Sequence, residues 1–301
     1  MNLIQNICQK NYWTNTYGLA RSFLAISLLL TLTFNSKGVI IPTIEGVPVN
    51  VFIHGEGFNK FNFFILFGHE YYNLMRFLAC IILSLCVIGY YPRYLGIIHW
   101  WIAYSFITVS SAVDGGDQIA ANLTLMLIPI TLLDSRSNHF SKLSSSPNDY
   151  HSIIAFVSYI IIRLQVAVIY LHAAVGKLNV EEWINGTAVY YWSHHTFFKY
   201  PDWIAMSLRP FMDSNLLIFT ITWGVIIFEI LLFSTIVMPN GKLKRRIGIS
   251  AIYFHLAILV LHGLVSFFFS ISAALILSHF SVNHSLNLKI KNIFNHEFQR
   301  L

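Results

Sequence analysis

Long apolar runs separated by short polar stretches dominate the chain. An apolar run of about 17–25 residues can cross the hydrocarbon core of a bilayer as an α-helix. Eight runs reach or approach this length, and we predict a membrane-spanning helix in each. They are Gly18–Phe34, Leu74–Tyr90, Gly96–Val113, Gln118–Leu133, Ile153–Ala174, Leu216–Met238, Ile247–Leu264 and Ser266–Phe280. The pattern therefore predicts an all-α integral membrane protein, with residues 1–301 forming a single transmembrane domain.

The division between the last two runs, near His262 and Gly263, is the least distinct. If this stretch is one continuous helix, the chain has seven spans. The carboxyl terminus then lies on the opposite side of the membrane from the amino terminus.

Composition supports the assignment to a membrane. The chain is 56% hydrophobic and only 11% charged, whereas soluble domains contain about 25% charged residues. So few charges cannot cover the surface of a soluble domain, and intrinsic disorder requires the opposite balance.

The basic residues predict the orientation. Cytoplasmic loops are enriched in Lys and Arg, and the most basic stretch, 241–246, is therefore expected as a cytoplasmic loop of a multi-pass protein in the cell membrane. With eight spans, both termini are cytoplasmic, and 11 of the 19 basic residues face the cytoplasm against 4 on the outer side. The cytoplasmic residues are Lys10, Arg93, Arg136, Lys142, Lys242, Lys244, Arg245, Arg246, Lys289, Lys291 and Arg300. The outer residues are Lys37, Lys60, Lys199 and Arg209. Because no basic patch has interleaved aromatic residues, the partner expected from this charge is membrane lipid rather than nucleic acid.

Two long segments are predicted to face outward. Turn residues in Asn35–Asn73 alternate with short β-branched runs such as Val49–Ile53, which indicates a small hairpin. Leu178–Asn215 is too polar to span but rich in Trp and Tyr, as expected of an amphipathic segment at the membrane surface.

One face of the fifth predicted span carries the clearest candidate chemistry. Arg163, Ala167, Tyr170, Ala174 and Lys177 follow a spacing of four, three, four and three residues. At 100° per residue they share a face, and the two alanines permit close approach of a neighbour. A desolvated Lys177 can act as a base or nucleophile near neutral pH. The alternative is a lysine at a helix end that extends its ammonium group to the lipid headgroups.

Glu229 lies in the middle of the sixth predicted span. Charged groups at that depth cost roughly 2.5–3.5 kcal/mol each on insertion scales, so they face the bundle interior and pair. The expected arrangement is an ion pair with Arg21, Arg76 or Arg163.

The remaining candidates are two carboxylates and two histidines. Asp114 and Asp117 lie in an outward turn, where Asp117 is expected to cap the following helix. A carboxylate pair in an outward cavity is the alternative. His255 and His262 are seven residues apart on one helix face, and each can either shuttle protons or pack between helices. No spacing in the chain predicts a metal site.

Three stretches carry a family resemblance: Arg163-Leu164-Gln165, Tyr170–Leu178 and Trp183-Ile184-Asn185-Gly186-Thr187-Ala188. With supporting stretches at 11–21, 113–117 and 253–255, they resemble the horizontally transferred transmembrane domain. This superfamily includes the vitamin K-dependent γ-carboxylase, and within it the chain is most similar to the sporulation-delaying protein B family of bacterial peptide-toxin systems.

The resemblance implies roles for single residues. Lys177 matches the lysine held to deprotonate the reduced vitamin in the carboxylase, and His255 matches a histidine of a later carboxylase helix. Gly176 stands where the carboxylase has a second lysine, and the large substrate-binding extramembrane domain has no counterpart. γ-Glutamyl carboxylation is therefore not expected.

Three functions stay open. The first is maturation or export of a small secreted peptide precursor, alone or with a soluble partner from the same operon, through a lysine pocket that opens to the outer side. The second is an oxidoreductase or epoxidase-type enzyme in which Lys177 deprotonates a quinol-like lipid, and a quinone is then the expected cofactor. The third is a non-enzymatic immunity or scaffold protein. The catalytic candidates are Lys177, His255 and Asp117.

Overall fold

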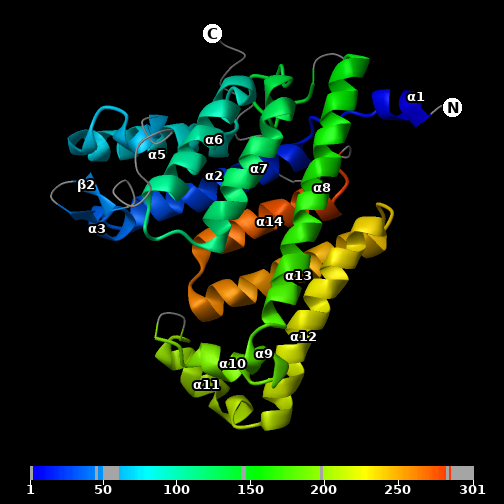
Figure 1. The fold of residues 1–301 in the computed structure, drawn as a ribbon. Helices are drawn as coiled ribbons and strands as arrows, with labels where there is room; N and C mark the ends of the chain where they lie inside the picture. Colours follow the sequence, from blue (N-terminus) through cyan, green and yellow to red (C-terminus); the bar gives the residue numbers. More distant parts are fainter. Residues whose placement is uncertain are drawn as a thin grey trace.

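A computed structural model describes residues 3–44, 47–49, 61–143, 147–196, 199–282 and 285. As predicted, the fold is helical, and eight long helices form the bundle in Figure 1. They are α2 (Asn15–Phe34), α5 (Tyr72–Ile88), α6 (Pro92–Val109), α7 (Gly115–Leu132), α8 (Asp149–Lys177), α12 (Asn215–Ser234), α13 (Lys242–His262) and α14 (Val265–His279). A short helix, α1 (Leu3–Cys8), precedes them.

Five helical stretches are long and apolar enough to cross a membrane: Asn15–Phe34, His69–Ile88, Asp149–Lys177, Asn215–Val237 and Lys242–His262. The first two of these include α2 and α5, and the fourth runs from α12 through the 3₁₀ turn η4 (Thr235–Val237). The helices α6, α7 and α14 contain 18, 18 and 15 residues. The chain is thus a multi-pass membrane protein, and the number of eight spans stays a prediction.

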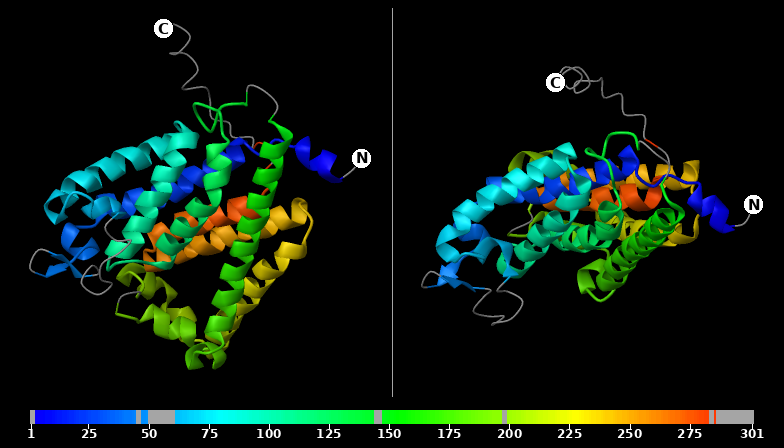
Figure 2. Two further views of the ribbon diagram at one scale, coloured as in Figure 1. Left: turned by 45° about the horizontal axis from the view of Figure 1, so that its top comes forward. Right: turned by 90° about the horizontal axis from the view of Figure 1, so that it is seen from above.

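Helices α2 and α14 lie side by side in the middle of the bundle (Figure 2). From Ser270 to His279 every residue of α14 is buried, including three serines. A helix with apolar residues all around it has no face for solvent, so it is covered by neighbours on all sides. α2, α7 and α8 contribute to the core around α14, and α5 and α6 pack with α2 in a second core.

Hydrogen bonds show which helix ends lie together. At the start of α2, Thr14 donates from Oγ1 to the carbonyl of Val282, just beyond α14, over 2.6 Å. Trp13 donates from Nε1 to the carbonyl of Ile130 near the end of α7. We call this end of the bundle the terminal side. α2 begins and α14 ends on this side. A chain whose first helix begins and whose last helix ends on the same side crosses the bundle an even number of times.

The other end, which we call the opposite side, is connected in the same way. Arg76 at the start of α5 donates to the carbonyl of Asn35 after α2. Ser266 at the start of α14 donates to the carboxylate of Asp114, which precedes α7. The first contact joins the end of α2 to the start of α5, and the second joins the start of α7 to the start of α14.

The turn between α13 and α14 resolves the alternative of one long helix. Gly263 ends α13 in the left-handed region, with φ of 73°, a conformation that favours glycine. The chain therefore divides here, and the seven-span alternative with a continuous helix is wrong. Residues 242–246 were predicted to form a basic loop, but they are the first turns of α13, because Lys and Arg are good helix formers.

The first of the two segments predicted to face outward contains α3 (Lys37–Ile40) and a two-stranded antiparallel hairpin. Its strands, β1 (Thr43–Ile44) and β2 (Val47–Pro48), pair Thr43 with Pro48 and Ile44 with Val47. The hairpin thus lies just before the predicted Val49–Ile53, and residues 50–60 lie outside the described part. Two 3₁₀ turns, η2 (Phe63–Ile65) and η3 (His69–Tyr71), lead into α5.

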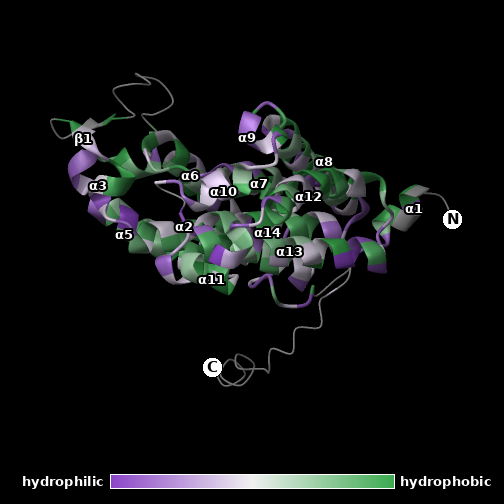
Figure 3. Cartoon of the chain, turned by 90° about the horizontal axis from the view of Figure 1, so that it is seen from below, coloured by the Kyte–Doolittle hydropathy of each residue, from purple (hydrophilic) through white to green (hydrophobic). Residues whose placement is uncertain are grey.

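The second segment predicted to face outward forms three short helices, α9 (Glu181–Ile184), α10 (Ala188–Ser193) and α11 (Asp202–Met212). In α11 the side chain of Ile204 is buried, whereas Trp203, Met206 and Phe211 are exposed. Hydrophobic residues colour most of the bundle in Figure 3, and the long helices expose many of them, for example Ile227 of α12. Such exposed apolar faces are those expected of lipid contacts.

Candidate functional site

The charged residues of α8 and α12 meet in the interior. The Lys177 ammonium nitrogen lies 2.7 Å from Oε1 and 2.9 Å from Oε2 of Glu229, so it donates to both carboxylate oxygens. The Glu229 side chain is 8% exposed and that of Lys177 is 21% exposed. Glu229 lies 14 residues into α12, roughly 21 Å from its start at 1.5 Å per residue. The pair is therefore deep within the span rather than at its outer edge.

The predicted face of α8 explains why Lys177 reaches this depth. Ala167, Tyr170 and Ala174 are all buried on that face, and Lys177 is the last residue of the helix. Its side chain turns back, donating to the carbonyl of Ala173 over 3.3 Å. The ring of Trp183, from α9, lies 5.1 Å from the ammonium nitrogen. A cation over an indole ring is attracted by the negative face of the π system.

A second polar pair lies beside the first. The Tyr170 hydroxyl and Nε2 of His255, on α13, are 3.1 Å apart, and both residues are buried. The His255 Nδ1 atom is buried without a hydrogen-bond partner. Tyr170 is close enough to interact electrostatically with Glu229, and His255 with Lys177. We call Lys177, Glu229, Tyr170 and His255 the buried polar cluster.

The predicted partners of Glu229 are wrong, since none of the three arginines is its partner. Arg21 contacts Nδ1 of His139 at 2.9 Å, and Arg76 donates to the carbonyls of Thr33 and Asn35. Arg163 donates to the carbonyl of Ile236 over 3.5 Å. The sequence pattern correctly placed Lys177 on the interior face of α8. It did not show how α12 is aligned along α8, and this alignment decides which cation lies beside Glu229.

The turn before α7 is a capping box. The Asp114 side chain accepts from the backbone N–H of Asp117 at 2.9 Å, and the Asp117 side chain accepts from that of Asp114 at 3.1 Å. The interpretation as a helix cap was thus right in kind, but the cap is Asp114 and not Asp117. Asp117 occupies the third helical position, where a carboxylate returns the bond to the cap. Asp117 lies outside the buried polar cluster.

His262 also lies apart from that cluster. Its ring is 5.1 Å from the ring of Tyr200, so it connects the end of α13 to the segment before α11. The His255 ring instead packs against Phe267 at 5.4 Å. The two histidines therefore contact different elements, although they lie on one helix.

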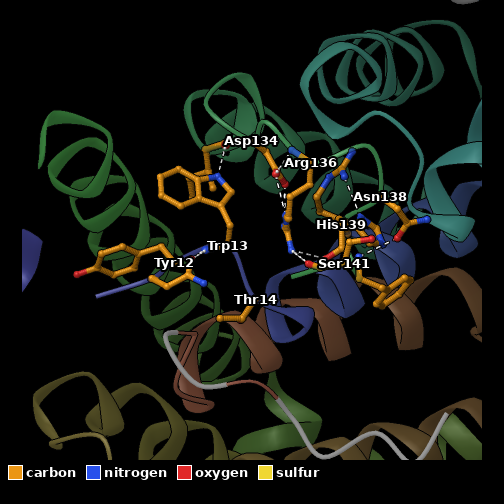
Figure 4. A network of polar contacts seen from close by, with 12 residues as sticks. Tyr12, Trp13, Thr14, Asp134, Arg136, Asn138, His139 and Ser141 are labelled. Carbon is orange, nitrogen blue, oxygen red and sulfur yellow. Dashed lines mark hydrogen bonds and ion pairs between the residues drawn. The ribbon is translucent and has the colours of Figure 1, made fainter. Parts of the chain in front are cut away.

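A polar network on the terminal side was not anticipated from the sequence (Figure 4). Asp134 accepts two hydrogen bonds from the Arg136 guanidinium, each 2.8 Å long, and both side chains are buried. Arg136 also donates to the carbonyls of His139 and Ser141. Burial and the neighbouring Arg21 and Arg136 hold the pKa of His139 well below its ordinary value of 6.5. The Asp-x-Arg spacing at 134–136 is the available signal, whereas Arg136 was predicted only as one of the cytoplasmic basic residues.

The cluster brings an amine, a carboxylate, a phenol and an imidazole together in the bundle interior. Each of these groups can hold a proton. Among the residues that the structure describes, no group of three or more His, Cys, Asp or Glu side chains is arranged to hold a metal ion.

The fold and the buried charges define a class: a multi-pass helical membrane protein with an ion pair deep in its bundle. Comparison with known proteins then places the chain in a family. It is 37% identical to sporulation-delaying protein SdpB of Bacillus subtilis (strain 168) over 284 residues, which are 92% of this chain and 85% of that one. It is also 37% identical to the uncharacterized protein YitO of the same organism over 278 residues, 89% of this chain and 86% of that one. The chain belongs to the SdpB family.

No model of a protein family matches the chain, and no solved structure matches it. Membership of the horizontally transferred transmembrane superfamily, with its carboxylase, therefore stays a prediction.

Proposed function

We propose that the protein matures or exports a small peptide toxin across the cell membrane, alone or with a soluble partner. The identity to SdpB over nine-tenths of the chain carries this proposal, because the family resemblance implies a peptide-toxin system. Both chain termini are assigned to the cytoplasm, and the opposite side of the bundle to the outer surface. The bundle crosses the membrane eight times.

Within this function we assign the working role to Lys177. Its pairing with Glu229 keeps an amine in the bundle interior at a depth where an unpaired charge is costly. Trp183 connects the amine to the outer segment that contains α9, α10 and α11. A peptide that enters from this segment and displaces the Trp183 ring would meet the amine in a pocket that opens outward.

The test measures peptide and protein together. The chain is co-expressed with a small secreted peptide precursor. Mature peptide in the medium is measured by mass spectrometry, and the membrane level of the protein is measured by immunoblot. We expect Lys177→Ala to abolish mature peptide. Because removing one member of a buried pair costs about 3–5 kcal/mol, the protein level must be followed in the same cells.

A charge exchange separates chemistry from folding. The double variant Lys177→Glu with Glu229→Lys retains an ion pair but moves the amine from α8 to α12. We expect normal protein level without mature peptide. Recovery of both would show that the pair only supports the fold, as in an immunity or scaffold protein. Normal processing by a well-expressed Lys177→Ala variant would remove Lys177 from the mechanism.

A second candidate function is deprotonation of a quinol-like lipid, with Asp117 and His255 as further proton-carrying candidates. The hydrogen bond between Tyr170 and His255 favours it, since the unpartnered Nδ1 atom of His255 lies within the same cluster as the amine. This function requires a quinone that co-purifies with the protein. Retention of activity in quinone-free preparations would contradict it.

A further inference from the structure

A second group of charges lies on the terminal side, between α8, α12, α13 and α14. A small cavity of about 10 Å³ opens there. Its polar lining consists of Arg163, Thr235, Lys244, Ser278 and His279. This volume is close to the least that a single water molecule needs, so the cavity can hold one oxygen atom of a larger group.

The two cations at this cavity have weak bonds only. Arg163 donates to the carbonyl of Ile236 and Lys244 to that of Met238, each over 3.5 Å. Neither Arg163 nor Lys244 forms an ion pair with another residue that the structure describes. Lys244 is 2% exposed, and it is close enough to Arg163 for the two charges to repel each other. Arg163 is half-buried beside the buried Lys244. Two adjacent cations that are shielded from water and have no acid nearby are costly, and an anion between them would relieve that cost.

The other polar groups are held in place by the protein. The ring of His279 lies between two hydroxyls, with Nδ1 2.7 Å from Ser278 Oγ and Nε2 3.0 Å from Thr235 Oγ1. A Cβ built on Gly248 would lie 2.5 Å from His279 Cβ, so α13 and α14 are in close contact at this level. The Thr235 and Ser278 hydroxyls already donate to the carbonyls of Leu232 and Ala274. This wall therefore contributes no carboxylate, and the two cations are the partners left for an anion.

We propose that this cavity is a binding site for a phosphate group, in which one phosphate oxygen enters between Arg163 and Lys244. Guanidinium and ammonium groups are the usual partners of phosphate. Lys242 and Arg245 are exposed at the start of α13 and add positive charge near Lys244. Lys244 is the third residue of α13 and so lies in its first turn, which is the level of lipid headgroups if α13 crosses the membrane. An anionic phospholipid is thus the favoured source, and free phosphate supplies the same chemistry.

The test measures stabilisation by the ligand. Purified full-length protein in a neutral detergent is heated with phosphatidylglycerol, with phosphatidylcholine or with inorganic phosphate at matched ionic strength. A ligand that binds only the folded state raises the unfolding temperature. We expect phosphatidylglycerol to raise it more than phosphatidylcholine. The variants Lys244→Gln and Arg163→Gln should bind about tenfold more weakly, because each loses a charge-assisted hydrogen bond.

Matched controls remove or retain charge nearby. Arg246→Gln removes an exposed charge from the same helix and should change the affinity less than twofold, and Lys244→Arg should retain the response. Equal stabilisation by inorganic phosphate would support the site with free phosphate as its source. The proposal is overturned if the unfolding temperature is the same with either lipid as in phosphate-free buffer. It is also overturned if Arg246→Gln and Lys244→Gln weaken phosphatidylglycerol binding equally. If neither Gln variant folds, the comparison of lipids on the unsubstituted protein decides.

Discussion

At the scale of single residues, the buried charges divide into satisfied and unsatisfied groups. Lys177 has a carboxylate, a carbonyl and an indole ring around its ammonium group. Arg163 and Lys244, on the other side of the bundle, have only distant carbonyls. Both sets occur in helices that contact lipid, so the difference between them is local. It separates a site that holds its own counter-charge from one that can accept an anion.

His139 makes a residue-scale prediction about pH. Its pKa in the folded protein is far below 6.5, because it is buried beside Arg21 and Arg136. In the unfolded chain the imidazole binds a proton as pH falls below about 6.5, whereas in the folded protein it does not. Stability is therefore full above that pH and is lost as pH falls toward the folded pKa, by up to about 1.4 kcal/mol per pH unit.

The measurement is the unfolding temperature between pH 7.5 and 5. We expect His139→Gln to flatten its pH dependence, although the variant loses contacts to Arg21 and Ser22 and is less stable throughout. His194→Gln, at an exposed position, should leave the slope unchanged. An equal slope in the unsubstituted protein and in His139→Gln would contradict this account.

Which residues form the site was predictable in part. The spacing from Arg163 to Lys177 placed one face of α8 in the interior, because a helix repeats every 3.6 residues. The partners came from other helices, and their alignment along α8 depends on packing that no local pattern encodes. For the same reason, Glu229 was recognised as a paired charge but matched with the wrong cations.

At the scale of elements, the apolar runs located helices but shortened or shifted some of them. Ile153–Ala174 was predicted where α8 runs from Asp149 to Lys177. Hydropathy marks only the apolar part of a helix. Polar residues extend α8 at both ends, Asp149 at its start and Lys177 at its end inside the bundle. The start of α7 shows the same effect, since its capping box begins three residues before Asp117.

Two helical glycines give an element-scale prediction. A Cβ on Gly116 of α7 would lie 2.4 Å from the Cα atom of Phe267 in α14, so this pair of helices approaches as closely as a glycine permits. Gly224 of α12 has nothing within 4 Å of the same position. We expect Gly116→Ala to lower the free energy of unfolding by about 1–3 kcal/mol through overpacking.

Gly224→Ala is the matched control, because it adds the same methyl group in open space. It should be neutral or stabilise by up to about 1 kcal/mol, since alanine favours the helix. Both changes can be followed as unfolding temperatures in one detergent. Similar effects of the two substitutions would show that the α7–α14 contact is looser than described.

At the scale of the whole molecule, the hydrogen bonds between helix ends constrain the topology more than the charge count does. The bond from Thr14 to Val282 fixes the start of α2 beside the end of α14. The contact of Asp114 with Ser266 fixes the starts of α7 and α14 together at the other end. Together they favour an even number of crossings, as the distribution of Lys and Arg also does.

The corresponding prediction concerns which residues an impermeant thiol reagent can reach in intact cells. After replacement of Cys8, Cys80 and Cys86 by serine, single cysteines are placed at Asp202, whose side chain is 90% exposed, or at Tyr150, which is 75% exposed. We expect Asp202→Cys, at the start of α11 on the opposite side, to react in intact cells. Tyr150→Cys, on the terminal side, should react only after lysis, and Leu243→Cys at the start of α13 should behave likewise. Labelling of Tyr150→Cys without lysis would show that the orientation is the reverse of the one proposed. If Tyr150→Cys and Leu243→Cys differ in labelling, α8 and α12 do not both cross the membrane.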